Sequence, residues 1–223
     1  MKKLNVVITG ATGMVGEGVL FECMENQQVE SILIITRKPS GVSHPKVREV
    51  LHSDFSNVEP LKEQLKGYDA CFFCLGVSSV GMKEEEYTKL TYTLTLGFAK
   101  TLSEASPQAA FCYISGAGTD SSEKGRSMWA RVKGKTENDL AKLPFRATYH
   151  FRPGMMKPTK GQQRVLSAYK YLGWLYPVIK TFFPKAACTI KEVSQAMIHV
   201  TQQGYSQKNI EVSDIIALAK RSS

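Results

Sequence analysis

Short apolar runs alternate with amphipathic stretches through most of this chain of 223 residues. Apolar runs of strand length are typical of strands buried on both faces, and apolar residues spaced three and four apart are typical of helices. The predicted strands span residues 4–10, 31–37, 47–53, 69–76, 109–116 and 146–154, and the predicted helices span residues 14–25, 59–66, 84–105 and 127–142. The alternation predicts an α/β fold, a parallel sheet with helices on both faces.

The pattern changes after Gly154. The stretch 155–189 is basic and aromatic and is interrupted by three prolines, which predicts short helices that cover the substrate side of the sheet instead of another strand-helix unit. No linker or repeat interrupts the chain, so residues 1–223 are predicted to form one domain. A capping box formed by Thr189 and Glu192, a short strand near 209–213 and a last helix from Asp214 are expected to complete the fold.

Charge is distributed unevenly along the chain. The net charge is +9, with −2 on residues 1–118 and +11 on residues 119–223, so the basic half either faces an anion or is simply solvated. No basic run of five and no nucleic-acid-binding motif occurs, which argues against nucleic acid as the partner. The apolar runs are too short to span a bilayer, and the start of the chain is typical of a first strand, so we expect a cytoplasmic protein without an integral membrane segment.

Cysteine and histidine do not indicate a metal site or a disulfide framework. Cys71 and Cys74 form a C-x-x-C, but residues three apart on a strand point to opposite faces, so both are predicted to be core residues. The four histidines, His44, His52, His150 and His199, show no ligand spacing, and there is no acidic cluster. We therefore expect no bound metal.

The first predicted strand runs into three glycines, Gly10, Gly13 and Gly16, and then into a helix. Glycines at this spacing permit a tight turn and let the backbone approach a pyrophosphate at the start of the helix. In a chain that alternates strands and helices, this motif predicts a dinucleotide site in a doubly wound sheet of the Rossmann type. The alternative is a tight turn without a ligand.

The end of the second predicted strand bears on the choice of dinucleotide. A carboxylate that would accept the ribose hydroxyls of NAD(H) is absent there, and Arg37 and Lys38 occupy the position. Cations can bind a 2′-phosphate by charge-assisted hydrogen bonds, so NADP(H) is preferred and NAD(H) is less favoured. The alternative is that both side chains are a solvated strand end.

Several ordered segments, "GATGMVG", "TRKP", "SDF", "FCLGVSS", "YISGAG", "VKGKTE" and "FRPG", resemble those of atypical short-chain dehydrogenases/reductases, the NAD(P)-binding epimerase/dehydratase-like superfamily. Within it the chain resembles most the branch of Tat-interacting-protein-like oxidoreductases. The resemblance extends from about residue 4 to residue 200. It implies a Rossmann fold, a bound NADP(H) and a small-molecule substrate.

The resemblance also implies roles for individual residues around the cofactor. The pyrophosphate is expected at Gly10, Thr12, Gly13, Met14, Val15 and Gly16, the ribose phosphate at Arg37 and Lys38, adenine at Asp54 and Phe55, and the rest of the cofactor along Leu75, Gly76, Val77, Pro153 and Gly154. Without the resemblance, Asp54 is equally well explained as a turn or helix-capping residue.

The expected catalytic group departs from the family pattern. Active members use a serine or threonine, a tyrosine and a lysine four residues later. Lys133 matches the lysine, but Trp129 stands where the tyrosine belongs, and an indole N–H cannot transfer a proton near neutral pH. Ser115 matches the serine or else only ends its strand. Lys133 is expected to hold the nicotinamide ribose, with a solvated lysine on a helix as the alternative.

Three tyrosines could replace the missing acid. Tyr113 shares a strand face with Ser115 and is expected in the core, and Tyr92 lies on the helix after the fourth strand. Tyr87, near the start of that helix, is the better candidate, although a packing role is favoured for it.

The basic aromatic segment 161–188 has three interpretations: an amphipathic cover packed on the core, a lid over substrate, or a surface for a partner or for peripheral membrane contact. No pattern predicts an oligomeric state. Two functions stay open, an NADP(H)-dependent oxidoreductase or epimerase-like enzyme with an altered proton donor, which is slightly favoured, and a dinucleotide-binding sensor or scaffold without turnover.

Overall fold

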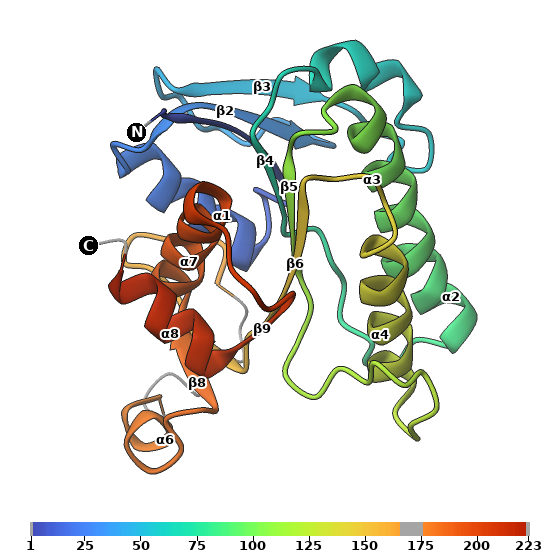
Figure 1. Ribbon diagram of the computed structural model, residues 1–223, viewed down its shortest axis with the longest axis vertical. Helices are drawn as coiled ribbons and strands as arrows, with labels where there is room; N and C mark the ends of the chain where they lie inside the picture. The colour runs from blue at the N-terminus through green and yellow to red at the C-terminus, as the bar shows by residue number, and fades with distance from the viewer. Residues whose placement is uncertain (1, 166–175, 222–223) are drawn as a thin grey trace.

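A sheet of seven parallel strands forms the centre of the molecule (Figure 1). The computed structural model describes residues 2–165 and 176–221. The strand order is β3-β2-β1-β4-β5-β6-β9, so the chain moves outward from β1 to β3 and then crosses to the other side of β1. The point where the order reverses lies between β1 and β4, which is where ligands bind in open sheets of this kind. The predicted fold class is confirmed.

The elements follow the predicted order. The strands of the main sheet are β1 (Leu4–Thr9), β2 (Val29–Thr36), β3 (Val47–Leu51), β4 (Ala70–Phe73), β5 (Ala110–Ile114), β6 (Ala147–Arg152) and β9 (Asn209–Glu211). The helices are α1 (Met14–Glu25), a 3₁₀ helix η1 (Glu59–Leu65), α2 (Glu84–Thr88), a π-helical turn η2 (Lys89–Thr93), α3 (Leu94–Ala105), α4 (Met128–Leu140), α6 (Tyr176–Phe182), α7 (Ile190–Gln203) and α8 (Val212–Lys220).

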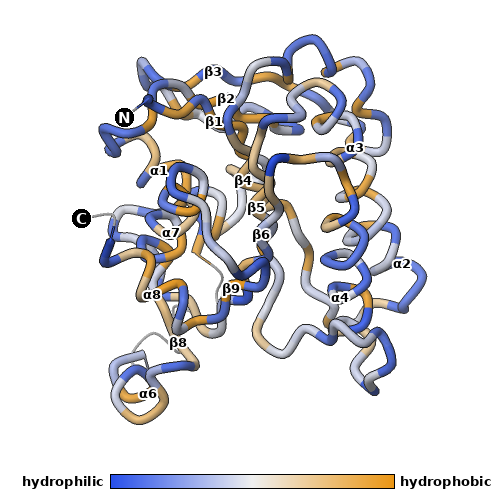
Figure 2. Tube along the Cα trace, in the orientation of Figure 1, coloured by the Kyte–Doolittle hydropathy of each residue, from blue (hydrophilic) through white to orange (hydrophobic). Residues whose placement is uncertain are grey.

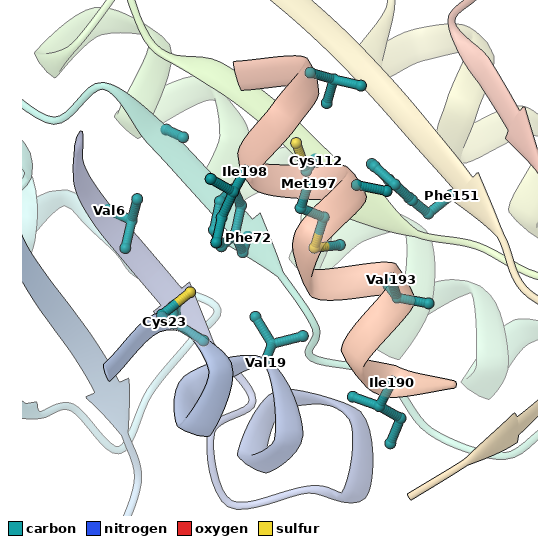
Figure 3. Close-up of a cluster of buried hydrophobic side chains, with 14 of the residues drawn as sticks. Val6, Val19, Cys23, Phe72, Cys112, Phe151, Ile190, Val193, Met197 and Ile198 are labelled. Carbon is teal, nitrogen blue, oxygen red and sulfur yellow. The ribbon is translucent and has the colours of Figure 1, made fainter. Parts of the chain in front are cut away.

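Helices cover both faces of the sheet (Figure 1). Alternate residues of each strand enter different clusters: Val6 and Phe72 pack under α1 and α7, whereas Val7 and Phe73 pack under α3. Figure 3 shows the first of these clusters, in which Met197 and Ile198 of α7 lie over the strands. Hydrophobic positions run along the central strands, and the outer turns are mostly hydrophilic (Figure 2). Burial on both faces explains why the strands are apolar runs and not alternating patterns.

A small second sheet lies outside the prediction. β7 (Met155–Lys157) pairs in parallel with β8 (Ala187–Thr189), in a region expected to hold only short helices. Neither strand has a recognisable apolar run, because each is three residues long. A Cβ at Gly154 would lie 2.2 Å from the carbonyl oxygen of Ala186, so this approach of two distant segments requires glycine. The predicted cover of short helices therefore also contains a short pair of strands.

Other boundaries differ from the predictions by small amounts. The predicted strand 69–76 ends at Phe73, and α8 begins at Val212 instead of Asp214. The capping box is confirmed: the Thr189 hydroxyl accepts from the Glu192 amide, and the Glu192 carboxylate accepts from the Thr189 amide. Within the described ranges, no helix is both long and apolar enough to cross a bilayer.

Cys71 is a core residue, as predicted, whereas Cys74 is half-buried against the core. All five are free; Cys71 belongs to the cluster under α3, and Cys74 packs against the cluster on the opposite face. Burial raises the pKa of both thiols well above the usual value. In residues 2–165 and 176–221, no group of three or more histidine, cysteine, aspartate or glutamate side chains could hold a metal ion.

Candidate cofactor and active site

The glycine turn between β1 and α1 is closely packed on one side and open on the other. Gly10 has a φ of 71°, and a Cβ there would lie 2.7 Å from the backbone of Cys74. A Cβ at Gly16 would lie 2.1 Å from the Gly10 carbonyl oxygen. Helix α1 begins after Gly13 without a side-chain cap, and Thr12 and Gly13 are exposed. The first amides of α1 are therefore available to an anion, as a pyrophosphate site requires.

Beside this turn, the carboxyl ends of three strands surround a cavity of about 280 Å³. Six of the predicted cofactor residues line it: Arg37 from the end of β2, Asp54 and Phe55 after β3, and Leu75, Gly76 and Val77 after β4. The other side of the cavity is formed by η2 and the start of α3 through Lys89, Leu90, Thr93 and Leu94. The sequence analysis missed these four, because their only signal is a helical spacing that packing explains equally well.

Two cations stand at the end of β2. Arg37 and Lys38 are exposed, and neither forms a hydrogen bond or ion pair with another residue in the described part of the chain. The nearby Asp54 carboxylate accepts hydrogen bonds from the amide and the hydroxyl of Ser56, which lower its pKa. Asp54 thus serves as a turn residue while it also borders the cavity. Phe55 is buried and stacks on Phe98, with ring centroids 6.5 Å apart.

Lys133 projects from α4 toward the carboxyl end of β5. Its Nζ atom donates to the carbonyl oxygens of Ile114 at 3.1 Å and Ser115 at 3.3 Å, and to the Tyr113 hydroxyl at 3.4 Å. The side chain is half-buried, and desolvation lowers the pKa of the ammonium group to about 8 against the opposing field of Glu137. This lysine is not the freely solvated residue of the alternative interpretation.

Ser115 lies inside the turn that follows β5. Its hydroxyl shares a hydrogen bond of 2.9 Å with the Thr119 hydroxyl, which in turn donates to the Gly116 carbonyl oxygen at 2.8 Å. Ser115 is buried, and its amide donates to Phe151 of β6. In this arrangement the hydroxyl supports the turn, which matches the structural alternative for this residue.

The Trp129 ring packs along the same turn. A Cβ at Gly116 would lie 3.6 Å from the ring, and one at Gly118 would lie 3.7 Å from it. Trp129 is half-buried and is one helical turn before Lys133 on α4. The indole therefore forms an apolar wall where the family pattern places a phenol.

Of the three tyrosines considered for the role of that phenol, two are buried and the third is bonded to a carboxylate. Tyr113 is 1% exposed and Tyr87 is 2% exposed, and burial raises the pKa of both hydroxyls. Tyr92 donates to the Asp139 carboxylate at 2.8 Å, on the surface between α3 and α4. The packing roles that were favoured for Tyr87 and Tyr113 are confirmed.

The end of β6 is joined to α4 by a buried ion pair that the sequence analysis did not identify. Two guanidinium nitrogens of Arg152 bind the Glu137 carboxylate at 3.0 and 2.5 Å, and Glu137 is 1% exposed. Arg152 also binds Glu211 at 3.2 Å, and the next residue, Pro153, accepts a hydrogen bond from the Ala117 amide. These contacts hold Pro153 and Gly154 at the turn after β5. Their signal in the sequence was limited to the "FRPG" and "VKGKTE" segments.

Comparisons with known proteins agree with this geometry. The sequence profile of the NAD dependent epimerase/dehydratase family matches residues 6–126, more than half of the chain. The mitochondrial protein FMP52 of Debaryomyces hansenii is 26% identical over 208 residues, which cover 92% of this chain and 90% of that protein.

Solved structures share the fold at low identity. ADP-L-glycero-D-manno-heptose-6-epimerase of Helicobacter pylori has a TM-score of 0.66 at 17% identity and covers 99% of this chain and 82% of its own. The Bordetella bronchiseptica enzyme WbmF, solved in complex with NAD⁺, has a TM-score of 0.67 at 16% identity and covers 99% of this chain and 78% of its own.

Proposed function

The chain belongs to the NAD dependent epimerase/dehydratase family, and we propose that it is an NADP(H)-dependent oxidoreductase or epimerase-like enzyme that acts on a small carbonyl or hydroxyl compound. The observation that carries this proposal is the meeting of the open glycine turn, an unpaired Arg37 and a desolvated Lys133 at one edge of the sheet. Such an edge is where a dinucleotide binds in doubly wound folds.

The adenosine half of the cofactor is proposed to lie in the cavity at the carboxyl ends of β2, β3 and β4. Thr12 and Gly13 leave room for the pyrophosphate, and Phe55, Leu75 and Val77 provide an apolar wall for adenine. Arg37 supports NADP(H) over NAD(H), because its guanidinium can bind a 2′-phosphate and forms no ion pair with a carboxylate of the described residues.

The nicotinamide half is proposed to lie along the ends of β5 and β6, beside Lys133 and Pro153. When bound, the nicotinamide supplies or accepts a hydride. Lys133 would hold the ribose, and because its pKa is about 8, most of it is protonated at pH 7 and it can give a proton to a substrate oxygen. We assign it the acid role that Trp129 cannot perform, with the indole as a wall of the substrate site.

One observation favours the second candidate, a dinucleotide-binding sensor or scaffold. The Ser115 hydroxyl is engaged in its own turn, and the Lys133 ammonium already has three acceptors, so in the described part of the chain neither of these two groups is free as it would be in an ordinary reductase. In that case the cofactor would bind and no substrate would turn over.

The C-terminal cover and the location of the protein remain proposals. Residues 155–189 are proposed to shield the substrate side of a single domain. Of its described aromatic residues, Tyr176 is buried, whereas Phe182 and Phe183 are 71% and 66% exposed, which supports a lid or peripheral membrane contact more than packing on the core. Tyr169, Lys170, Leu172, Trp174 and Leu175 lie outside the described residues. A cytoplasmic location and a place in the Tat-interacting-protein-like branch stay predictions; the D. hansenii relative is named as mitochondrial.

Titration of the wild-type protein with NADPH and NADH, followed by NADPH oxidation with a panel of small aldehydes and ketones, tests the proposal. We expect NADPH to bind at least about tenfold more tightly, a difference of about 1.4 kcal/mol. Binding of neither cofactor would refute the dinucleotide site, and a preference for NADH would refute the assignment of Arg37. Tight binding without turnover of any carbonyl compound would favour the sensor.

A further inference from the structure

The segment 159–164, which follows β7, crosses the N-terminal end of α1. The Gln162 side chain donates to the Met14 carbonyl oxygen at 2.6 Å and accepts from the Thr159 amide at 2.6 Å. The carboxylate of Glu17, a buried residue in the first turn of α1, accepts hydrogen bonds from the amides of residue 163 at 3.3 Å and residue 164 at 2.8 Å. A part of the chain almost 150 residues away is thus fixed beside the glycine turn.

This docking places the Arg164 guanidinium between two loops. Its two terminal nitrogens donate to the Thr12 carbonyl oxygen of the glycine turn at 3.2 Å and to the Ser40 carbonyl oxygen after β2 at 3.1 Å. Both acceptors are neutral, and Arg164 forms no ion pair with another described residue. The carboxylate of Glu49 is close enough to interact electrostatically with Arg164. It accepts hydrogen bonds from the Thr36 hydroxyl at 2.7 Å and the Ser40 amide at 2.9 Å.

The position of Arg164 has a chemical consequence for the cofactor. The glycine turn and the end of β2 border the adenosine ribose in a doubly wound fold, and Arg37 and Lys38 stand at that strand end. A guanidinium that rests on neutral carbonyl oxygens gains stronger, charge-assisted and bidentate hydrogen bonds when a phosphate is offered.

We infer that Arg164 is a specificity-determining residue for the 2′-phosphate of NADP(H), supplied by the C-terminal segment to a site otherwise built from the first two strands. The inference rests on the proposed NADP(H) binding and adds a residue that neither the glycine motif nor the end of β2 indicates. It also links cofactor choice to the cover, because the same segment leads from β7 into residues beyond 165.

Arg164→Gln tests this assignment with three probes, NADPH, NADH and adenosine 2′,5′-bisphosphate. Loss of a hydrogen-bonded charge on the phosphate should weaken NADPH and the bisphosphate by about 10- to 100-fold. NADH lacks the phosphate, so its dissociation constant should stay within about twofold. Lys160→Gln is the matched control, because it removes one exposed cation from the same segment and should change none of the three constants.

The possible outcomes separate this inference from the proposed function. Unchanged NADPH binding in Arg164→Gln, or equal losses for NADPH and NADH, would overturn the role of Arg164. If Arg37→Asp loses NADPH selectivity and Arg164→Gln does not, the proposed cofactor stands and only this inference fails. If the wild-type protein binds neither cofactor, both the proposed function and the role of Arg164 are refuted.

A second variant protects the test against unfolding. If the thermal midpoint or circular dichroism of Arg164→Gln shows a loss of structure, Arg164→Lys replaces it. This variant keeps the charge without the planar fork, so it should lose NADPH affinity by several-fold and keep NADH affinity. Equal losses for the two cofactors in Arg164→Lys would also overturn the inference.

Discussion

Replacing Lys133 with methionine is expected to stabilise the protein at pH 7, with an effect that reverses at high pH. Methionine keeps an unbranched stem of similar length and removes the charge. In the folded protein, desolvation lowers the pKa of the Lys133 ammonium from 10.5 to about 8. A charged side chain that lowers the stability of the fold is a candidate for a functional role, because packing alone would not favour it.

The magnitude follows from the difference between these two pKa values. At roughly 1.4 kcal/mol for each pH unit, holding the protonated side chain in the fold costs about 3 kcal/mol. Because the folded pKa is the lower one, the unfolded chain binds the additional proton between pH 8 and 10.5. The free energy of unfolding therefore rises with pH across this window, and the full cost is present below pH 8.

The variant also loses hydrogen bonds of Lys133, and this loss offsets part of the stability gained by removing the charge. Nζ donates to the carbonyl oxygens of Ile114 and Ser115, and losing these bonds costs about 1 kcal/mol. Lys133→Met should thus raise the free energy of unfolding by about 2 kcal/mol at pH 7 and lower it by about 1 kcal/mol above pH 10.5.

Urea denaturation of the wild-type and variant proteins at pH 7 and pH 11 measures this change. The titration of all other groups is common to both proteins and cancels in the difference. Lys135→Met is the control: this exposed lysine is paired with Asp139 at 3.3 Å, so its removal should cost little at either pH. A stability difference for Lys133→Met that does not change with pH would refute the desolvation of this group.

Three further predictions concern the cofactor, the missing acid and the ion pair. Arg37→Asp should weaken NADPH by at least about tenfold and leave NADH unchanged in fluorescence titrations, and equal losses would contradict a 2′-phosphate at this strand end. Trp129→Tyr should add NADPH-dependent reduction of test aldehydes that Trp129→Phe does not add, whereas tight NADPH binding without that gain would support the sensor. Glu137→Gln should lower the free energy of unfolding, measured by urea denaturation, by about 3 kcal/mol, because Arg152 loses its buried carboxylate partner. A loss below about 1 kcal/mol would mean that the ion pair with Glu211 is enough to balance the charge of Arg152.

The candidate site was predicted unevenly from the sequence. Six of the residues that line the cavity, Arg37, Asp54, Phe55 and Leu75–Val77, were identified, because the ends of parallel strands meet at one edge of the sheet, whereas the residues of η2 and α3 that line it were not. The sequence could not indicate how each side chain is engaged. Ser115 is a case in point, since whether its hydroxyl faces substrate or a turn depends on Thr119, which has no pattern of its own.

The order of strands and helices, their burial on both faces, the glycine turn and the helix cap at Thr189 were determined by the sequence alone. Each of these depends on residues within a few positions of one another, through hydrophobic periodicity, the freedom of glycine or a local hydrogen bond. Such local rules are enough to specify the elements and to point to the cofactor turn.

The tertiary structure alone decided the contacts between distant segments. It pairs β7 with β8 across Gly154, joins Arg152 to Glu137, lowers the pKa of Lys133 and brings Arg164 to the Thr12 carbonyl oxygen. Each result depends on how closely two surfaces pack and on how much water they exclude. Those quantities are properties of the whole folded chain, and no short stretch of sequence encodes them.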